Sequence, residues 1–211
     1  NHIRGCGNVL PFFKTFFRIN TMSSEAEICS NALSLLGDDP ITALTDDSTR
    51  ARLCNRFYSS TRDSVLRAYT WNFAITRQTL AQSTTTPNFE FSFQYQLPED
   101  PFCLKALKID DDYEKWRVEG RFLLTNASTV SLQYIARVTD VGQYDALFTE
   151  SLEYRLAEKM AWPITQNNKS VEVFNALYTQ KLAEARTMSA QEGYGETFDA
   201  DDLIVARSEV L

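Results

Sequence analysis

The sequence lacks most of the groups on which enzymes rely. Its 211 residues include one histidine, His2, so a serine or cysteine triad would have no imidazole base. The seven glycines are scattered and form no phosphate-binding loop. The four cysteines form no CxxC pair, and we expect Cys29 and Cys54 to be small apolar residues on helix faces, with reduced thiols. We therefore expect no enzymatic activity, no metal and no cofactor.

Long apolar runs and excess basic charge are also missing. No run of about 18 apolar residues occurs, so we expect neither a membrane-spanning helix nor a membrane partner. The chain has 21 basic and 28 acidic side chains, and leaving out the three basic residues of segment 1–21 gives 18 against 28, a net charge of −10. Such a surface repels phosphate, which disfavours generic nucleic-acid binding, although one local basic face is compatible with it.

Residues 1–21 differ from the rest of the chain. They hold no acid, and their apolar run at residues 9–13 is too short for a signal-peptide core and is followed by Lys14. The sequence Met22-Ser23-Ser24-Glu25 resembles a natural start. We therefore treat residues 1–21 as an extension of doubtful origin, which is either upstream sequence or an aromatic-rich arm that docks on a partner.

Helix caps and apolar periodicity predict four helices. Ser24 and Glu27 match a capping box, and Gly37 can end the helix that they start. Pro163 should stop the third helix, and Ser170 should cap the fourth. The predicted helices cover residues 25–36, 49–69, 145–162 and 170–192.

Between the second and third helices the apolar period changes to two. The clearest alternation predicts an aromatic strand with one buried face, made by Phe89, Phe91, Phe93, Tyr95 and Leu97. Glu119-Gly120 is a plausible hairpin turn. Shorter strands are predicted at residues 103–109, 115–119, 121–125 and 130–138. Together these strands predict a small antiparallel sheet.

The predicted fold is α+β and mainly α: a helical bundle with a small inserted antiparallel β-sheet subdomain and an extended C-terminal arm. We assign residues 22–82 and 144–192 to the helical core, residues 83–143 to the β subdomain and residues 193–211 to the arm.

Two segments are candidates for contact with partners. The second predicted helix carries arginines that form either a solvated basic face or a partner site, and the candidates for a subunit interface are Arg50, Arg52, Arg56 and Arg62. The C-terminal arm mixes acids with apolar residues, which is typical of segments that become ordered on a partner. Its candidate binding residues are Phe198, Leu203, Ile204 and Val205.

A series of short motifs extends over about residues 25–165. These motifs are Ile28-Cys29, Asn31-Ala32-Leu33, Leu36-Gly37, Pro40-Ile41, Asp47-Ser48, Ala51-Arg52, Cys54, Trp71-Asn72-Phe73-Ala74, Tyr95, Leu97-Pro98, Tyr134-Ile135, Val138-Thr139-Asp140, Asp145, Phe148 and Leu156-Ala157. Their order and spacing resemble the head-to-tail adaptor family of short-tailed phages, which includes tail tubular protein A and related tail accessory factors. No single motif among them is catalytic.

The resemblance implies a structural role in the virion. Members of this family are mostly helical with a small β region, and they assemble as a twelve-membered ring beneath the portal protein. The ring prolongs the channel through which genomic DNA passes without specific binding. It also seats the tail nozzle or hub and, in some phages, the fibres or spikes. The resemblance therefore implies a homo-oligomer located in the tail of the virion, next to the portal, and made in the host cytoplasm.

Paired carboxylates leave one catalytic alternative open. Glycoside hydrolysis needs only an acid and a base or nucleophile, so a virion-associated cell-wall hydrolase could work without histidine. The candidates are Glu99 with Asp100 and the run Asp110-Asp111-Asp112. Acidic clusters of this kind are usually turns or solvated caps, and we therefore favour the adaptor.

Overall fold

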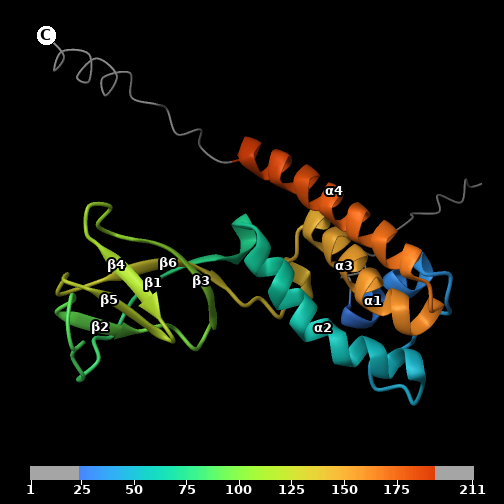
Figure 1. The fold of residues 1–211 in the computed structure, drawn as a ribbon, viewed down its shortest axis with the longest axis horizontal. Helices are drawn as coiled ribbons and strands as arrows, with labels where there is room; N and C mark the ends of the chain where they lie inside the picture. Colours follow the sequence, from blue (N-terminus) through green and yellow to red (C-terminus); the bar gives the residue numbers. More distant parts are fainter. Residues whose placement is uncertain (1–23, 193–211) are drawn as a thin grey trace, which may run out of the picture.

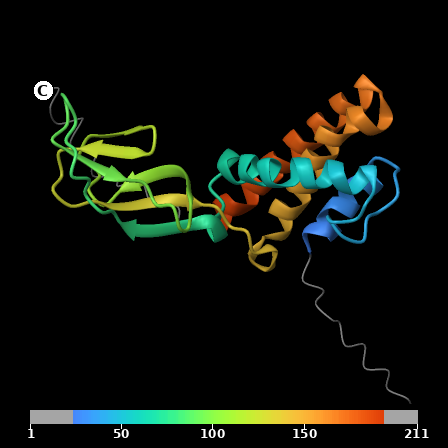
Figure 2. The same cartoon turned by 90° about the horizontal axis from the view of Figure 1, so that it is seen from below.

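The computed structural model describes residues 24–192, and within them it places the helices at one end of an elongated molecule and the strands at the other (Figure 1, Figure 2). The helices are α1 (Glu25–Leu35), α2 (Thr49–Ala68), α3 (Ala146–Thr165) and α4 (Asn168–Glu192). The strands are β1 (Ile75–Thr79), β2 (Phe93–Gln96), β3 (Cys103–Ile109), β4 (Trp116–Glu119), β5 (Phe122–Thr125) and β6 (Ser131–Ala136). The mixed α+β class is confirmed.

Local capping chemistry forms the ends of α1 and α2 as predicted. The Glu27 amide donates to Ser24 Oγ at 3.1 Å, and the Ser24 amide donates to Glu27 Oε2 at 3.4 Å, which completes the capping box. At the other end of α1, Gly37 has a φ of +76°, a value that glycine adopts without strain. Ser48 caps α2 by accepting a hydrogen bond from the Ala51 amide at 3.1 Å.

The boundary between α3 and α4 differs from the prediction. Pro163 lies inside α3, which continues to Thr165 and ends where Gln166 takes a φ of +51°. A proline in the last turn removes one backbone donor, and here the Gln166 amide still bonds the Trp162 carbonyl at 2.9 Å. The prediction that Ser170 caps α4 is wrong, because α4 begins at Asn168.

Helix α3 is the centre of the helical part, because it packs against each of the other three helices. Its buried face carries Leu152, Leu156 and Met160. Cys54 of α2 reaches this face, with its Sγ 3.7 Å from Met160 Sδ, and Cys29 and Cys54 are both buried free thiols, as predicted. The neighbouring Cys54 thiol and burial together raise the pKa of Cys29, so this thiol stays protonated.

An aromatic cluster closes the helical part on the side of the sheets. The ring of Phe148 lies 5.2 Å from Trp71, 5.1 Å from Phe73 and 4.8 Å from Tyr144, each pair measured between centroids and each edge-on. The Trp71 indole donates to the Val65 carbonyl at 2.9 Å, which fixes the chain as it leaves α2. The exit toward β1 is therefore rigidly packed.

The β part consists of two three-stranded antiparallel sheets, with strand orders β1-β6-β3 and β2-β5-β4. The chain beyond β1 joins them on one side, because the Ser83 amide donates to the Gln94 carbonyl at 2.8 Å and Gln82 bridges Tyr95. On the other side, β3 and β4 share no ladder in the described part of the chain. The two sheets thus leave a seam between β3 and β4.

Two strands differ from the sequence prediction. Strand β1 was not expected, and it pairs with β6 from Ile75 opposite Ile135 to Thr79 opposite Ser131. The predicted aromatic strand is shortened to β2, because Glu90 has a φ of +69° and Phe89 is 80% exposed. The Glu119-Gly120 turn is confirmed between β4 and β5.

Candidate interaction surfaces

The four arginines predicted for subunit contacts do not lie on one surface. Acids of the same chain hold Arg50 and Arg62, whereas Arg52 and Arg56 are exposed along α2. On this helix, Arg52 and Arg56 therefore remain the candidates for a subunit interface.

Arg50 connects the start of α2 to the turn after α1. Its Nε and Nη2 lie 2.7 Å and 2.6 Å from Asp38 Oδ1, and its Nη2 lies 3.2 Å from Asp39 Oδ2. The hydrogen bond from Arg50 lowers the pKa of the Asp38 carboxyl below its ordinary value. This arginine therefore stabilises the connection between two helices.

Arg62 is buried, with 6% of its surface exposed, and the prediction that it lies on an exposed basic face is wrong. Its Nε and Nη2 donate to Asp63 Oδ1 at 3.1 Å and 3.0 Å. The other oxygen of Asp63 lies 2.7 Å from Nη2 of Arg137, which follows β6. Asp63 thus joins two arginines and links α2 to the β part.

Phe102 extends this link to the sheets. The guanidinium carbon of Arg137 lies 4.3 Å from the Phe102 ring centroid, and that of Arg121 lies 4.1 Å from it. Arg121 also donates to the carbonyls of Cys103 at 2.9 Å and Pro98 at 2.6 Å. Sequence patterns do not show this network, because its members are up to some 70 residues apart along the chain.

Arg52 and Arg56 lie one turn apart on the exposed face of α2. Arg52 Nη1 is 2.7 Å from Asp47 Oδ1, but the two side chains are 66% and 96% exposed, so this ion pair is weak. No ion pair or hydrogen bond joins the Arg56 side chain to another described residue. We call this pair the α2 basic face; the exposed Asp47 contacts Arg52, and Arg56 has no acidic partner among the described residues.

Three acids of helices α1 and α3 form what we call the acidic surface: Glu27 is exposed, and Glu150 and Glu153 are half-buried. Asn31 Nδ2 donates to Glu153 Oε1 at 2.7 Å. Burial, together with the nearby charges of Glu150 and Glu27, raises the pKa of Glu153 above its ordinary value. Lys181 pairs with Glu150 at 2.9 Å, but no described cation pairs with Glu153. The acidic surface therefore favours the approach of a cation.

A groove of about 490 Å³ occupies the seam between β3 and β4. Three of its lining side chains are basic and none is acidic, although the chain as a whole is acidic. None of the three basic side chains forms an ion pair with a described acid. The lining residues are Arg67, Leu97, Phe102, Cys103, Leu104, Lys105, Ala106, Trp116, Val118, Gly120 and Arg121.

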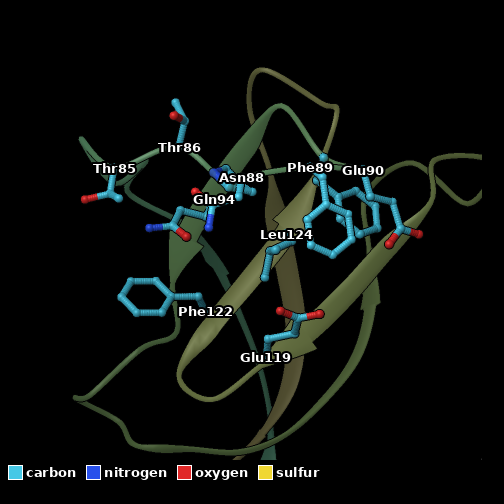
Figure 3. Close-up of a pocket in the computed structure, with 11 residues that line it drawn as sticks. Thr85, Thr86, Asn88, Phe89, Glu90, Gln94, Glu119, Phe122 and Leu124 are labelled. Carbon is cyan, nitrogen blue, oxygen red and sulfur yellow. The ribbon is translucent and has the colours of Figure 1, made fainter.

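A hollow of about 340 Å³ lies where the loop before β2 meets the sheet β2-β5-β4 (Figure 3). Figure 3 shows Phe89, Leu124 and Glu119 among the side chains gathered around it. Arg117 Nη1 lies 3.4 Å from Glu90 and 3.9 Å from Glu119, the two acids of the lining. This hollow is opposite in charge to the groove between β3 and β4.

The carboxylates considered for glycan hydrolysis have local contacts in turns. Asp110 Oδ1 accepts from the Ser131 amide at 3.0 Å, and Asp111 Oδ1 accepts from the Tyr113 amide at 3.0 Å. Glu99 and Asp100 lie in an exposed turn that is closed by a bridge between Glu99 and Phe102. These contacts fit the structural interpretation of the acidic clusters.

Within residues 24–192, no three His, Cys, Asp or Glu side chains are arranged to hold a metal ion. No helix of this same range has the length and apolar character needed to cross a bilayer. The predicted arm residues lie outside the described part of the chain; they are Phe198, Leu203, Ile204 and Val205. No protein-family model and no curated protein matches the sequence.

Proposed function

We propose that this chain is a structural virion protein, a head-to-tail adaptor that joins the portal to the tail nozzle or hub of a short-tailed phage. Twelve copies form a ring that prolongs the DNA channel. The helices act as a bundle that builds the ring, and residues 193–211 form an arm that reaches the portal. The resemblance supports this proposal because its motifs fall on structural positions, such as the α2 cap Ser48 and the buried Phe148 and Leu156.

The observation that carries the proposal is the pair of oppositely charged surfaces on the helical part. A ring of identical copies uses a heterologous interface, in which one surface of each copy meets a different surface of the next. The α2 basic face and the acidic surface lie on different helices, so one chain can present both at once. Opposite charges would orient the two copies and disfavour contacts between like surfaces.

Ring formation would also give partners to groups that lack them in the single chain. Arg56 has no acidic partner and Glu153 has no cationic partner among the described residues. An incoming arginine would offset the burial and like-charge repulsion that raise the pKa of Glu153. Contact between the two surfaces is therefore favourable on both sides.

The test is a double charge reversal, Arg52→Glu with Arg56→Glu. We expect the variant to lose ring assembly on the portal while its circular dichroism and unfolding midpoint stay those of the wild type, because both side chains are exposed. Native mass spectrometry of the chain mixed with its cognate portal measures the loss.

The matched control is Arg77→Glu with Lys108→Glu, which makes the same charge change at exposed positions of the β part. This control should assemble normally. Adding Glu150→Arg and Glu153→Arg to the first variant should restore the rings. Normal rings from Arg52→Glu with Arg56→Glu, or equal losses in the control, would overturn the proposed interface.

A further inference from the structure

We propose that the groove between β3 and β4 is a docking site for residues 199–205 of the same chain, which would add a strand along the free edge of β4. The segment reads Asp-Ala-Asp-Asp-Leu-Ile-Val. Such a contact gains affinity from main-chain hydrogen bonds and specificity from the side chains that enter the groove.

Strands β3 and β4 are both edge strands of their sheets, and we assign the added strand to the edge of β4. Strand β4 pairs with β5 on one side and has no ladder partner on its other side in the described part of the chain. On the facing strand β3, the carbonyls of Cys103 and Leu104 already accept hydrogen bonds from Arg121 at 2.9 Å and Arg67 at 2.5 Å. An added strand would therefore pair with β4 and lie against the side chains of β3.

The groove and the segment are complementary in charge and in apolarity. The groove presents Arg67, Lys105 and Arg121 without an acid, and its remaining lining is mostly apolar. Between residues 196 and 205 the sequence has four acids and no basic residue, followed at once by the apolar run Leu203-Ile204-Val205. The β-branched Ile and Val of this run favour a strand. A mainly apolar lining with only three cations suits this peptide better than a nucleic-acid strand, which needs a basic stripe.

The end of α4 places the segment within reach. Arg186 Nη2 donates to the Ala68 carbonyl at 3.3 Å, and Ala68 follows Arg67, a residue of the groove. Figure 1 shows the C-terminal ends of α2 and α4 close together on the side of the sheets. From Arg186, the six remaining helical residues carry the chain about 9 Å to the end of α4. Residues 193–198, if extended, can then span about 20 Å, so residue 199 can reach the groove of its own chain.

This docking concerns the free chain and goes beyond the proposed function. The portal, in that proposal, would draw on the same apolar residues of the arm. Docking in the isolated chain and ring formation on the portal are measured separately, so either can fail without the other.

The experiment places the photo-crosslinker p-benzoylphenylalanine at Val118, an exposed residue of β4 that lines the groove, in the full chain without portal. We expect mass spectrometry to find the crosslink within residues 199–205, with a yield that does not change on tenfold dilution. The same group at Val173, which is exposed on α4 and outside the groove, should not crosslink to this segment. Crosslinks from position 118 only to other segments, no crosslink at all, or a yield that falls on dilution would overturn the proposal.

Two charge variants and one exchange measurement complete the test. Lys105→Glu should lower the crosslink yield about threefold, as expected for one exposed ion pair, whereas Lys108→Glu, on the same strand but outside the groove, should leave it unchanged. In the chain without crosslinker, Leu203→Asp with Ile204→Asp should remove the hydrogen-exchange protection of those amides of residues 116–119 that point away from β5, whereas the amides bonded to β5 should stay protected. Equal yields in both lysine variants, or unchanged protection, would contradict docking at this site.

Discussion

Asp63 is the acid on which the junction between the helices and the sheets depends, and its removal should have a large effect on stability. It contacts Arg62, whose side chain is 8% exposed, and Arg137, whose side chain is 35% exposed. Removing one partner of a buried ion pair costs about 3–5 kcal/mol, because the other charge stays buried without compensation. Asp63 itself is 22% exposed, so water can partly replace it, and we expect Asp63→Ala to cost about 2–3 kcal/mol.

A second variant distinguishes the cost of leaving the Arg62 charge buried without an acid from the cost of losing the Asp63 contacts. Replacing Arg62 by methionine in the Asp63→Ala background removes the buried charge and keeps a similar volume, so we expect about 1–2 kcal/mol to be regained. Asp47→Ala is the control, because its ion pair with Arg52 is exposed and should contribute less than about 0.5 kcal/mol.

Urea unfolding followed by tryptophan fluorescence and circular dichroism measures these differences, provided that the slopes of the transitions agree. The contradicting result is that Arg62→Met destabilises the Asp63→Ala variant by as much as it destabilises the wild type. That outcome would mean that the two side chains act independently and that no charge is stranded.

Three further predictions concern single groups and the arm. The pKa of Glu153 is raised above its ordinary value of 4.5, so its ionisation opposes folding at neutral pH. Glu153→Gln should therefore raise the urea midpoint at pH 7 and leave it unchanged at pH 3, where the wild-type carboxyl is already protonated. The same variant should weaken ring assembly, because it removes a charge of the acidic surface. The pKa of Asp38 is lowered below its ordinary value of 3.8, so its charge stabilises the fold above that pH, and this contribution is lost as the pH falls through the lower, folded value. Asp38→Asn should therefore reduce stability at pH 7, with a difference from wild type that disappears near pH 2. Deleting residues 196–211 should leave the circular dichroism of the helices unchanged and abolish portal binding in a pull-down, and retained binding would contradict the role proposed for the arm.

The sequence was sufficient where local chemistry decides the structure. The capping box of Ser24 and Glu27 and the left-handed Gly37 involve neighbours in the chain, so their residue types predict their geometry. Strand β1 has a single large apolar residue, Ile75, and forms because β6 offers it an edge. Tertiary contacts determine this pairing, so the residues of β1 show little of the alternating apolar pattern that predicts a strand.

The candidate surface was predictable in part. The exposure of Arg52 and Arg56 follows from their position opposite the buried face of α2. Arg62 was misassigned, although a signal was present: it follows Tyr58 by four residues and precedes Val65 by three, so it shares the buried face. Its acid partner is the adjacent Asp63, but the contact of that acid with Arg137 joins residues more than 70 positions apart in the sequence and could not be predicted from it.

We propose above all that copies of this chain bind one another and the portal and so form a ring. Native mass spectrometry of the full chain with its cognate portal, checked by electron microscopy, tests it most directly. We predict a closed ring of twelve copies seated on the portal. A chain that stays monomeric when the portal is present would contradict the account.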